Sequence, residues 1–175
     1  MAILQATSHQ QLGITVLNKA LFYADLCALR DIGHSLTGSG YIALPQGPVL
    51  NHYERALVRA LESNGYAEQL REGVMRPMIV RQQLANYEHL GDEELGIARL
   101  VARKIEAKTA AWVSDYSHEN LAWQSAFRDR TGAPIDMHLA LQQVIEADPW
   151  LDEDDGPSEV ADALTAAADD EGVPF

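Results

Sequence analysis

Apolar residues recur at helical spacing along most of the chain. Residues 12–32 are apolar almost all round, which predicts a helix in the middle of a bundle, ending at Gly33. The other segments have one apolar face, which is typical of helices at the surface of a small domain. Helices are therefore predicted over residues 12–32, from Pro48 to the Asn64-Gly65 stop, from Asp92 past Lys104, from Ser117 through Phe127, and from Pro134 past Ile145.

One stretch has a different pattern. Between Gly73 and Leu84, a short apolar run is broken by Pro77 and flanked by arginines, which favours extended structure over a helix. The predicted fold is therefore mainly α. We expect a compact single-domain helical bundle around a central apolar helix, with a short β-hairpin near residues 73–84.

The charge of the chain is concentrated at its end. The 175 residues carry a net charge of −13, and residues 148–175 hold ten acids and no Lys or Arg. This pattern predicts a domain over residues 1–147 followed by an acidic tail over residues 148–175. Because the thirteen bases are scattered as singles or pairs, nucleic acid is not expected as a direct partner.

The sequence favours a cytoplasmic protein without a cofactor. Its longest unbroken hydrophobic run has five residues, whereas a membrane span needs about 20. The first residues have neither a basic segment nor an apolar stretch of secretory length. Cys27 is the single cysteine and the six histidines show no metal-ligand spacing, so neither a disulfide nor a metal site is predicted.

Motifs for catalysis are incomplete. His118-Glu119 would need a second histidine four residues after His118 to bind zinc, but the chain has Ala122 there. Asp115, Ser117 and His118 include the residue types of a hydrolytic triad, yet no Gly-x-Ser-x-Gly elbow exposes a nucleophile. No catalytic residues are therefore assigned.

Asp25 carries the strongest signal among the polar residues. It lies inside the most apolar predicted helix, where an unpaired carboxylate would cost several kcal/mol. We therefore expect non-local partners for it. The candidates are Thr37, Tyr41, Arg55 and His118. A buried network that fixes the packing of helices is favoured over catalysis.

Two blocks of sequence together resemble a known family. The first runs from Lys19 to Tyr53, and the second contains Ser117-His118-Glu119 and Trp123. The first block comprises Lys19-Ala20-Leu21-Phe22-Tyr23-Ala24-Asp25, Leu29, Gly33, Thr37-Gly38, Tyr41-Ile42-Ala43, Gly47-Pro48-Val49 and Tyr53. In this order they resemble the Panacea domain of the SocA-like antitoxins, over roughly residues 12–147.

The resemblance implies an antitoxin without enzymatic activity. Such a protein neutralises a toxin, typically encoded by the adjacent gene, through direct protein contact, and the eponymous relative delivers its toxin to a ClpXP-type protease. The glycines and proline of the pattern are expected to set turns, and its polar and aromatic residues to form either a buried cluster or a recognition groove. The candidate binding and family-motif residues are Tyr23, Asp25, Thr37, Tyr41, Gly47, Pro48, Tyr53, His118 and Trp123.

Two alternatives stay open at this point. One is a small hydrolase-like enzyme that uses Asp25 and His118, which requires both side chains within hydrogen-bond reach at a pocket. The other is an orphan helical adaptor, borne by a phage or related to stress, that has kept the domain and lost its toxin.

Overall fold

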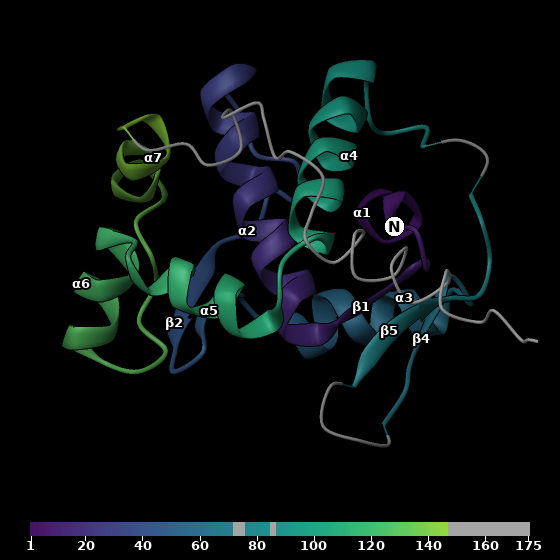
Figure 1. Ribbon diagram of the computed structural model, residues 1–175, viewed down its shortest axis with the longest axis horizontal. Helices are drawn as coiled ribbons and strands as arrows, with labels where there is room; N and C mark the ends of the chain where they lie inside the picture. Colours follow the sequence, from purple (N-terminus) through teal and green to yellow (C-terminus); the bar gives the residue numbers. More distant parts are fainter. Residues whose placement is uncertain (72–75, 85–86, 147–175) are drawn as a thin grey trace, which may run out of the picture.

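The longest helix, α2, organises the fold. The computed structural model describes residues 1–71, 76–84 and 87–146, with the backbone alone for residues 143–146. Helix α2 (Ile14–Asp31) has twelve buried residues and contacts α1, α4, α5, α7 and β3, with the other elements arranged around it (Figure 1). Its end follows the prediction, because Gly33 adopts a φ of +78° and donates its N–H to the carbonyl of Ala28 at 3.0 Å. The predicted central helix is confirmed.

Shorter helices surround α2, so the prediction of a mainly helical fold is also confirmed. A π-helical turn, η1, leads directly into α3. The bounds of these elements are α1 (Ala2–Ala6), η1 (Glu54–Arg59), α3 (Ala60–Ser63), α4 (Asp92–Glu106), α5 (Ala110–His118), α6 (Leu121–Asp129) and α7 (Met137–Glu146). Within the part of the chain described, no helix combines the length and the hydropathy needed to cross a membrane.

A β-hairpin occupies the position where a helix was predicted to start. Strands β2 (Tyr41–Leu44) and β3 (Gly47–Leu50) pair antiparallel, and Pro48 lies opposite Ala43. The N–H of Ala43 donates to the carbonyl of Ala133 at 2.9 Å, so this pair does not exchange ladder hydrogen bonds. A proline can therefore lie in the strand without breaking the ladder. The prediction of a helix from Pro48 is wrong, and the helical segment begins at Glu54.

The hairpin predicted near residues 73–84 is in fact part of a three-stranded sheet. Its strands are β1 (Gln11–Gly13), β5 (Pro77–Val80) and β4 (Ala67–Gln69), in the order β1-β5-β4, and all pairs are antiparallel. Strand β5 lies inside the predicted range, but its hairpin partner β4 precedes that range. Strand β1 includes Leu12 and Gly13, which the prediction placed in the central helix.

The break between α5 and α6 is displaced from the predicted one. Ser117 stays inside α5, and Asn120 caps α6 by accepting the N–H groups of Ala122 and Trp123 at 3.1 and 3.3 Å. Both residue types are good N-caps. Asn120 is favoured because its amide also donates to the carbonyl of Ala140 in α7, at 3.2 Å.

The acidic tail, residues 148–175, lies outside the described residues, as do the predicted hairpin residues 73–75. The division into a domain and a tail stays a prediction.

Candidate functional site

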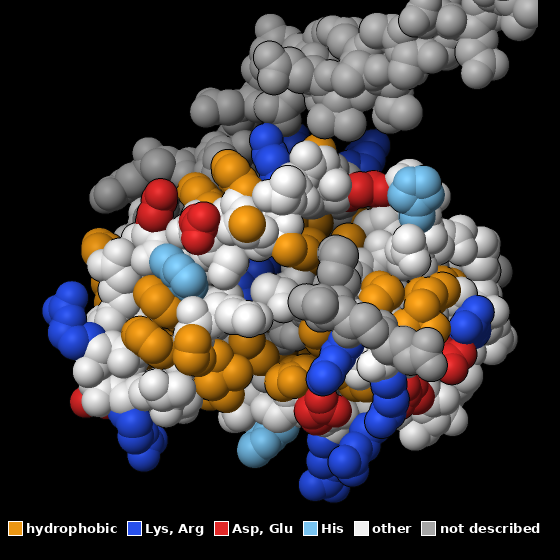
Figure 2. All heavy atoms as spheres, turned by 60° about the horizontal axis from the view of Figure 1, so that its bottom comes forward, with side chains coloured by type: hydrophobic (Ala, Val, Ile, Leu, Met, Phe, Trp, Pro, Cys, Tyr) orange, Lys and Arg blue, Asp and Glu red, His pale blue; other side chains and the backbone are white. Residues whose placement is uncertain are grey.

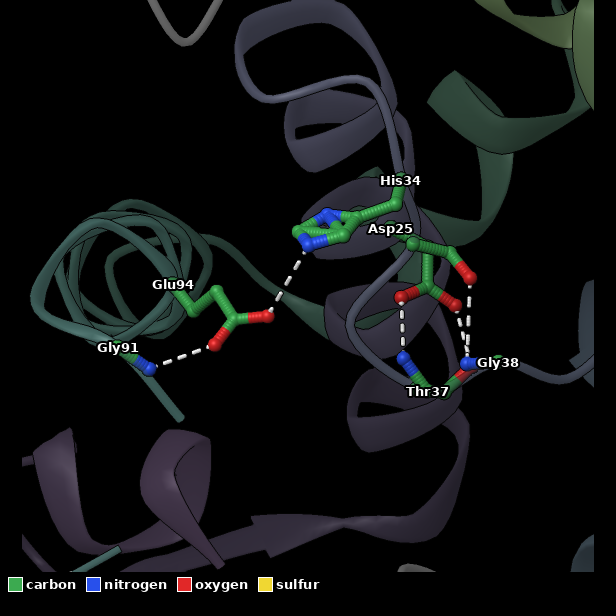
Figure 3. Close-up of polar contacts among 7 residues, drawn as sticks. Asp25, His34, Thr37, Gly38, Gly91 and Glu94 are labelled. Carbon is green, nitrogen blue, oxygen red and sulfur yellow. Dashed lines mark hydrogen bonds and ion pairs between the residues drawn. The ribbon is translucent and has the colours of Figure 1, made fainter. Parts of the chain in front are cut away.

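Asp25 forms a buried network with the connection that leads from α2 to β2. Its Oδ1 accepts the N–H of Thr37 at 2.8 Å, and its Oδ2 accepts the hydroxyls of Thr37 and Tyr41 at 2.5 and 2.8 Å. Figure 3 shows Thr37 turned toward the carboxylate from the connecting loop. All three hydrogen bonds are donated to Asp25, so they favour its charged form.

Burial acts against these hydrogen bonds. The carboxyl group has no exposed surface, and burial raises the pKa of Asp25 while its hydrogen bonds to Thr37 and Tyr41 act to lower it. Burial and the neighbouring Asp25 raise the pKa of Tyr41 well above its usual value, so the phenol keeps the proton that it donates. Among the described residues, neither Arg55 nor His118 contacts the carboxylate; Arg55 is exposed and His118 lies in α5.

A second polar contact lies at the β2–β3 hairpin. Lys19 is fully buried in α2, and its ammonium donates to the carbonyl of Pro48 at 3.0 Å. Burial lowers the pKa of Lys19 to about 7. Lys19 was quoted as part of the family pattern but was not assigned to the candidate site. Its position inside an apolar helix, like that of Asp25, was the signal that could have identified it.

Gly47 is required at this contact. Its φ is +99°, and a Cβ there would lie 2.2 Å from the Oγ of Ser117 and 2.7 Å from the Cε of Lys19. Both neighbours are fully buried and are held by hydrogen bonds, Lys19 to Pro48 and Ser117 to the carbonyl of Ser114. The backbone of β3 therefore packs directly on α2 and α5, and a side chain at position 47 would separate them.

A hollow opens beside the hairpin turn, which we call the turn pocket. Its volume is about 260 Å³, and its lining includes Ile14, Lys19, Leu44, Pro45, Val49 and Tyr53. Figure 2 views this end of the molecule and shows hydrophobic side chains gathered in a broad band across it. Tyr53 lies half-buried at the start of η1, where burial and then Glu54 raise its pKa.

Aromatic rings hold the other side of the same hairpin. The indole Nε1 of Trp123 donates to the carbonyl of Leu44 at 3.1 Å. The ring of Trp123 is stacked between His118 and Phe127, with centroid distances of 4.2 and 4.9 Å. His118 therefore packs against an aromatic ring near the hairpin, away from Asp25.

Tyr23 belongs to the core. It is buried in α2, with ring centroids 5.3 Å from Phe22 and 5.6 Å from Tyr116, and burial raises its pKa well above its usual value. Phe22 also contacts Tyr41 edge to face, at 5.1 Å. This cluster of rings joins α2 to α5 and to β2.

Seven of the nine candidate residues form two groups, while Tyr23 lies in the core and His118 stacks on Trp123. Asp25, Thr37 and Tyr41 are joined in one buried network. Gly47 and Pro48 belong to the β2–β3 hairpin, and Tyr53 and Trp123 lie beside it. The geometry that an enzyme based on Asp25 and His118 requires is not found in the described part of the chain, because Asp25 is closed to solvent. In the same residues, no group of three or more His, Cys, Asp or Glu side chains is placed to hold a metal ion.

Comparison with known proteins identifies a family. A family model described as "Antitoxin SocA-like, Panacea domain" matches residues 17–124, which include both groups of candidate residues. No curated protein sequence and no solved structure shows significant similarity to the chain.

Proposed function

Because the chain belongs to the family of SocA-like antitoxins with a Panacea domain, we propose that it neutralises a toxin by direct protein–protein contact. The partner would be a protein encoded by the adjacent gene. The nine candidate residues act in this proposal as the framework that builds and presents a binding face, and no chemical step is assigned to them.

The observation that carries the proposal is the convergence of the family's residues on one hairpin. Lys19 and Gly47 fix the β3 strand against α2, and Trp123 fixes Leu44 at the end of β2. The turn between the strands borders the apolar turn pocket. A rigidly held apolar surface of this kind suits protein recognition, since binding then costs little conformational entropy.

The proposal is tested in cells and with purified protein. The adjacent gene is expressed alone and together with this chain, growth is followed, and the two proteins are co-purified. We expect the neighbour to be toxic, the toxicity to be relieved by this chain, and a stable complex to form. The proposal would be contradicted if the product of the adjacent gene is toxic, does not bind this chain and stays toxic in its presence.

Delivery of the toxin to a ClpXP-type protease is a separate part of the proposal. It predicts that the toxin's half-life shortens when this chain is present and that deleting the protease restores it. Neutralisation without any change in the half-life would leave direct inhibition as the mechanism.

The remaining expectations concern location and the alternatives. We expect the cytoplasm as the place of action, which cell fractionation would check. The closed position of Asp25 counts against the hydrolase alternative. If the product of the adjacent gene is harmless and forms no complex with this chain, the alternative of an orphan adaptor is favoured.

A further inference from the structure

The turn pocket has a single cation among its described lining residues. This cation is Lys19, which has no exposed surface and therefore lies at the floor of the pocket. The other polar side chains of the lining are uncharged at neutral pH, namely Thr15, Asn18, Gln46 and Tyr53. A buried ammonium group thus sets the electrostatic character of an otherwise apolar hollow.

The ammonium of Lys19 has more donors than the described residues satisfy. It carries three N–H groups, and its one hydrogen bond within the described chain is the 3.0 Å bond to the carbonyl of Pro48. None of the ion pairs between described residues includes Lys19. Burying a cation without a counter-ion costs free energy, and an anion placed beside it would offset part of that cost.

The described residues hold no carboxylate that balances this charge. Burial lowers the pKa of Lys19 to about 7, and no neighbouring acid in that part of the chain counteracts it. Glu54 lies next to Tyr53 in the chain, but it acts on the Tyr53 phenol and not on Lys19. The pocket therefore carries an excess of positive charge whenever Lys19 is protonated.

A second donor lies at the hairpin turn. The side-chain carbonyl of Gln46 accepts the hydroxyl of Thr15 at 3.2 Å, which leaves the Gln46 amide N–H groups to donate to a ligand. The side chain of Asn18 is engaged on both sides instead. It donates to the carbonyl of Ile14 at 2.9 Å and accepts the N–H of Leu50 at 3.1 Å. The pocket thus offers donors to an anion.

The volume of the pocket limits the size of a ligand. Its 260 Å³ correspond to roughly eight or nine water molecules, at about 30 Å³ each in the liquid. A ligand of about eight non-hydrogen atoms therefore fits. The apolar side chains of the lining would contact its body: Ile14, Leu44, Pro45 and Val49. Apolar walls above a buried cation suit a carboxylate on a short aliphatic stem.

We propose that the turn pocket binds a carboxylate on a short apolar stem, with the Lys19 ammonium as counter-ion and the Gln46 amide as a second donor. Two sources have this chemistry, a free aliphatic acid and an acidic side chain of the toxin. Only the second source rests on the proposed function, and the experiments below distinguish the two.

Binding of hexanoate to the full chain tests the pocket without a toxin. Hexanoate has about the right size, and hexanamide is its matched control, because it has the same shape and no charge. Each is titrated at pH 6, where Lys19 is mostly protonated, and binding is followed by NMR. We expect hexanoate to bind about tenfold more tightly than hexanamide, with the largest shifts at Leu44 and Val49. Equal affinities, or shifts away from the pocket, would overturn the proposal.

A substitution tests the role of Lys19. Lys19→Met keeps the length of the side chain and removes its charge, so the preference for hexanoate over hexanamide should disappear while hexanamide still binds. Retained binding of hexanamide shows that the pocket has folded. Lys108→Met is the matched control, since Lys108 does not line the turn pocket, and it should keep the preference. A preference that survives in Lys19→Met would assign the anion to another group and overturn the proposal.

The dependence on pH tests the natural protein, even if Lys19→Met does not fold. The preference for hexanoate should decline as the pH rises through the pKa of Lys19 and be lost near pH 9. Hexanoate stays ionised over this range. Tyr53, the other titratable side chain among the described lining residues, keeps its proton, because its pKa is raised from 10.0. The same preference at pH 6 and pH 9 would contradict the role of the ammonium.

The co-purified complex distinguishes the two sources. If hexanoate displaces the product of the adjacent gene, and Lys19→Met weakens the complex by about tenfold, the toxin supplies the carboxylate. If the complex forms equally well with hexanoate bound, the ligand is a free acid. Absence of any complex contradicts the proposed function alone, because the hexanoate measurements need only this chain. Failure of hexanoate to bind overturns the inference and leaves the antitoxin proposal standing.

Discussion

Replacing Asp25 with alanine removes the centre of the buried network. The variant leaves the N–H and hydroxyl of Thr37 and the hydroxyl of Tyr41 without their shared acceptor. Tyr41 is affected most, because its side chain is almost completely buried and water cannot replace the carboxylate. A buried donor without a partner costs about 1–3 kcal/mol, so the structure predicts a substantial loss of stability.

The expected loss in the free energy of unfolding is about 2–4 kcal/mol. Part of this loss is offset, because the alanine variant no longer pays the free-energy cost of burying a carboxylate, the cost that raises the pKa of Asp25. The variant Tyr41→Phe deletes one donor and leaves the carboxylate with its two bonds to Thr37, so it is expected to cost only about 1 kcal/mol.

Urea unfolding followed by circular dichroism measures both values. Asp31→Ala is the matched control, since Asp31 lies in the same helix but is exposed and pairs only with the adjacent Arg30 among the described residues. It is expected to cost less than about 0.5 kcal/mol. If Asp25→Ala were no more destabilising than Asp31→Ala, the reasoning about the buried network would be refuted.

Asp25 also predicts a dependence on pH. Its pKa is raised in the folded state, so the folded protein binds a proton more tightly than the unfolded chain does. This group's contribution to stability is therefore greatest at pH values below its usual pKa of 3.8 and falls as the pH rises through the folded-state pKa. Comparison with Asp25→Asn, which cannot titrate, isolates that contribution.

Three further predictions concern other buried groups. Gly47→Ala is expected to cost at least about 2 kcal/mol more than Gly132→Ala, because both glycines have positive φ but only Gly47 has neighbours within 3 Å; equal losses in urea unfolding would contradict this. Burial lowers the pKa of Lys19 to about 7, so above that pH the unfolded chain binds more protons than the folded protein does, and the free energy of unfolding should rise toward pH 10. Unfolding measured at several pH values should show this rise in the natural protein and not in Lys19→Met. Burial raises the pKa of Cys27 to about 11, so its thiol should react with a disulfide reagent only as fast as the protein unfolds; rapid reaction in the folded protein would show that the site opens.

The sequence predicts the fold best where a single pattern dominates. The central helix was placed to within two residues because its apolar residues extend all round and Gly33 ends it. The hairpin at Pro48 was missed because a proline is accepted both in the first turn of a helix and at a strand position that makes no ladder hydrogen bond. Only the pairing with residues 41–44 shows that this proline lies in a strand. Short strands such as β1 have too few residues for a period to be visible.

The candidate site shows the same division. The need of Asp25 for non-local partners follows from its apolar neighbours, and Thr37 and Tyr41 were among the candidates. The sequence could not exclude Arg55 and His118, because a residue type does not reveal which loop folds back onto the helix. The contact of Gly47 with Ser117, 70 residues further along the chain, depends on how α5 packs, and no local pattern encodes it.

The two groups of family residues restrain the same hairpin from opposite ends. Tyr41, at the start of β2, donates to Asp25, while Leu44, at the end of that strand, accepts from Trp123. Lys19, on α2 like Asp25, holds β3 through the carbonyl of Pro48. A strand fixed at both ends and along its partner has little freedom to adjust, so the turn and its pocket are preorganised. On the proposed function, a preorganised face of this kind would give the buried polar residues of an otherwise apolar helix a role, although each costs free energy to desolvate. Their hydrogen bonds are directional, so they fix the position of the hairpin on α2 more closely than apolar contacts alone would.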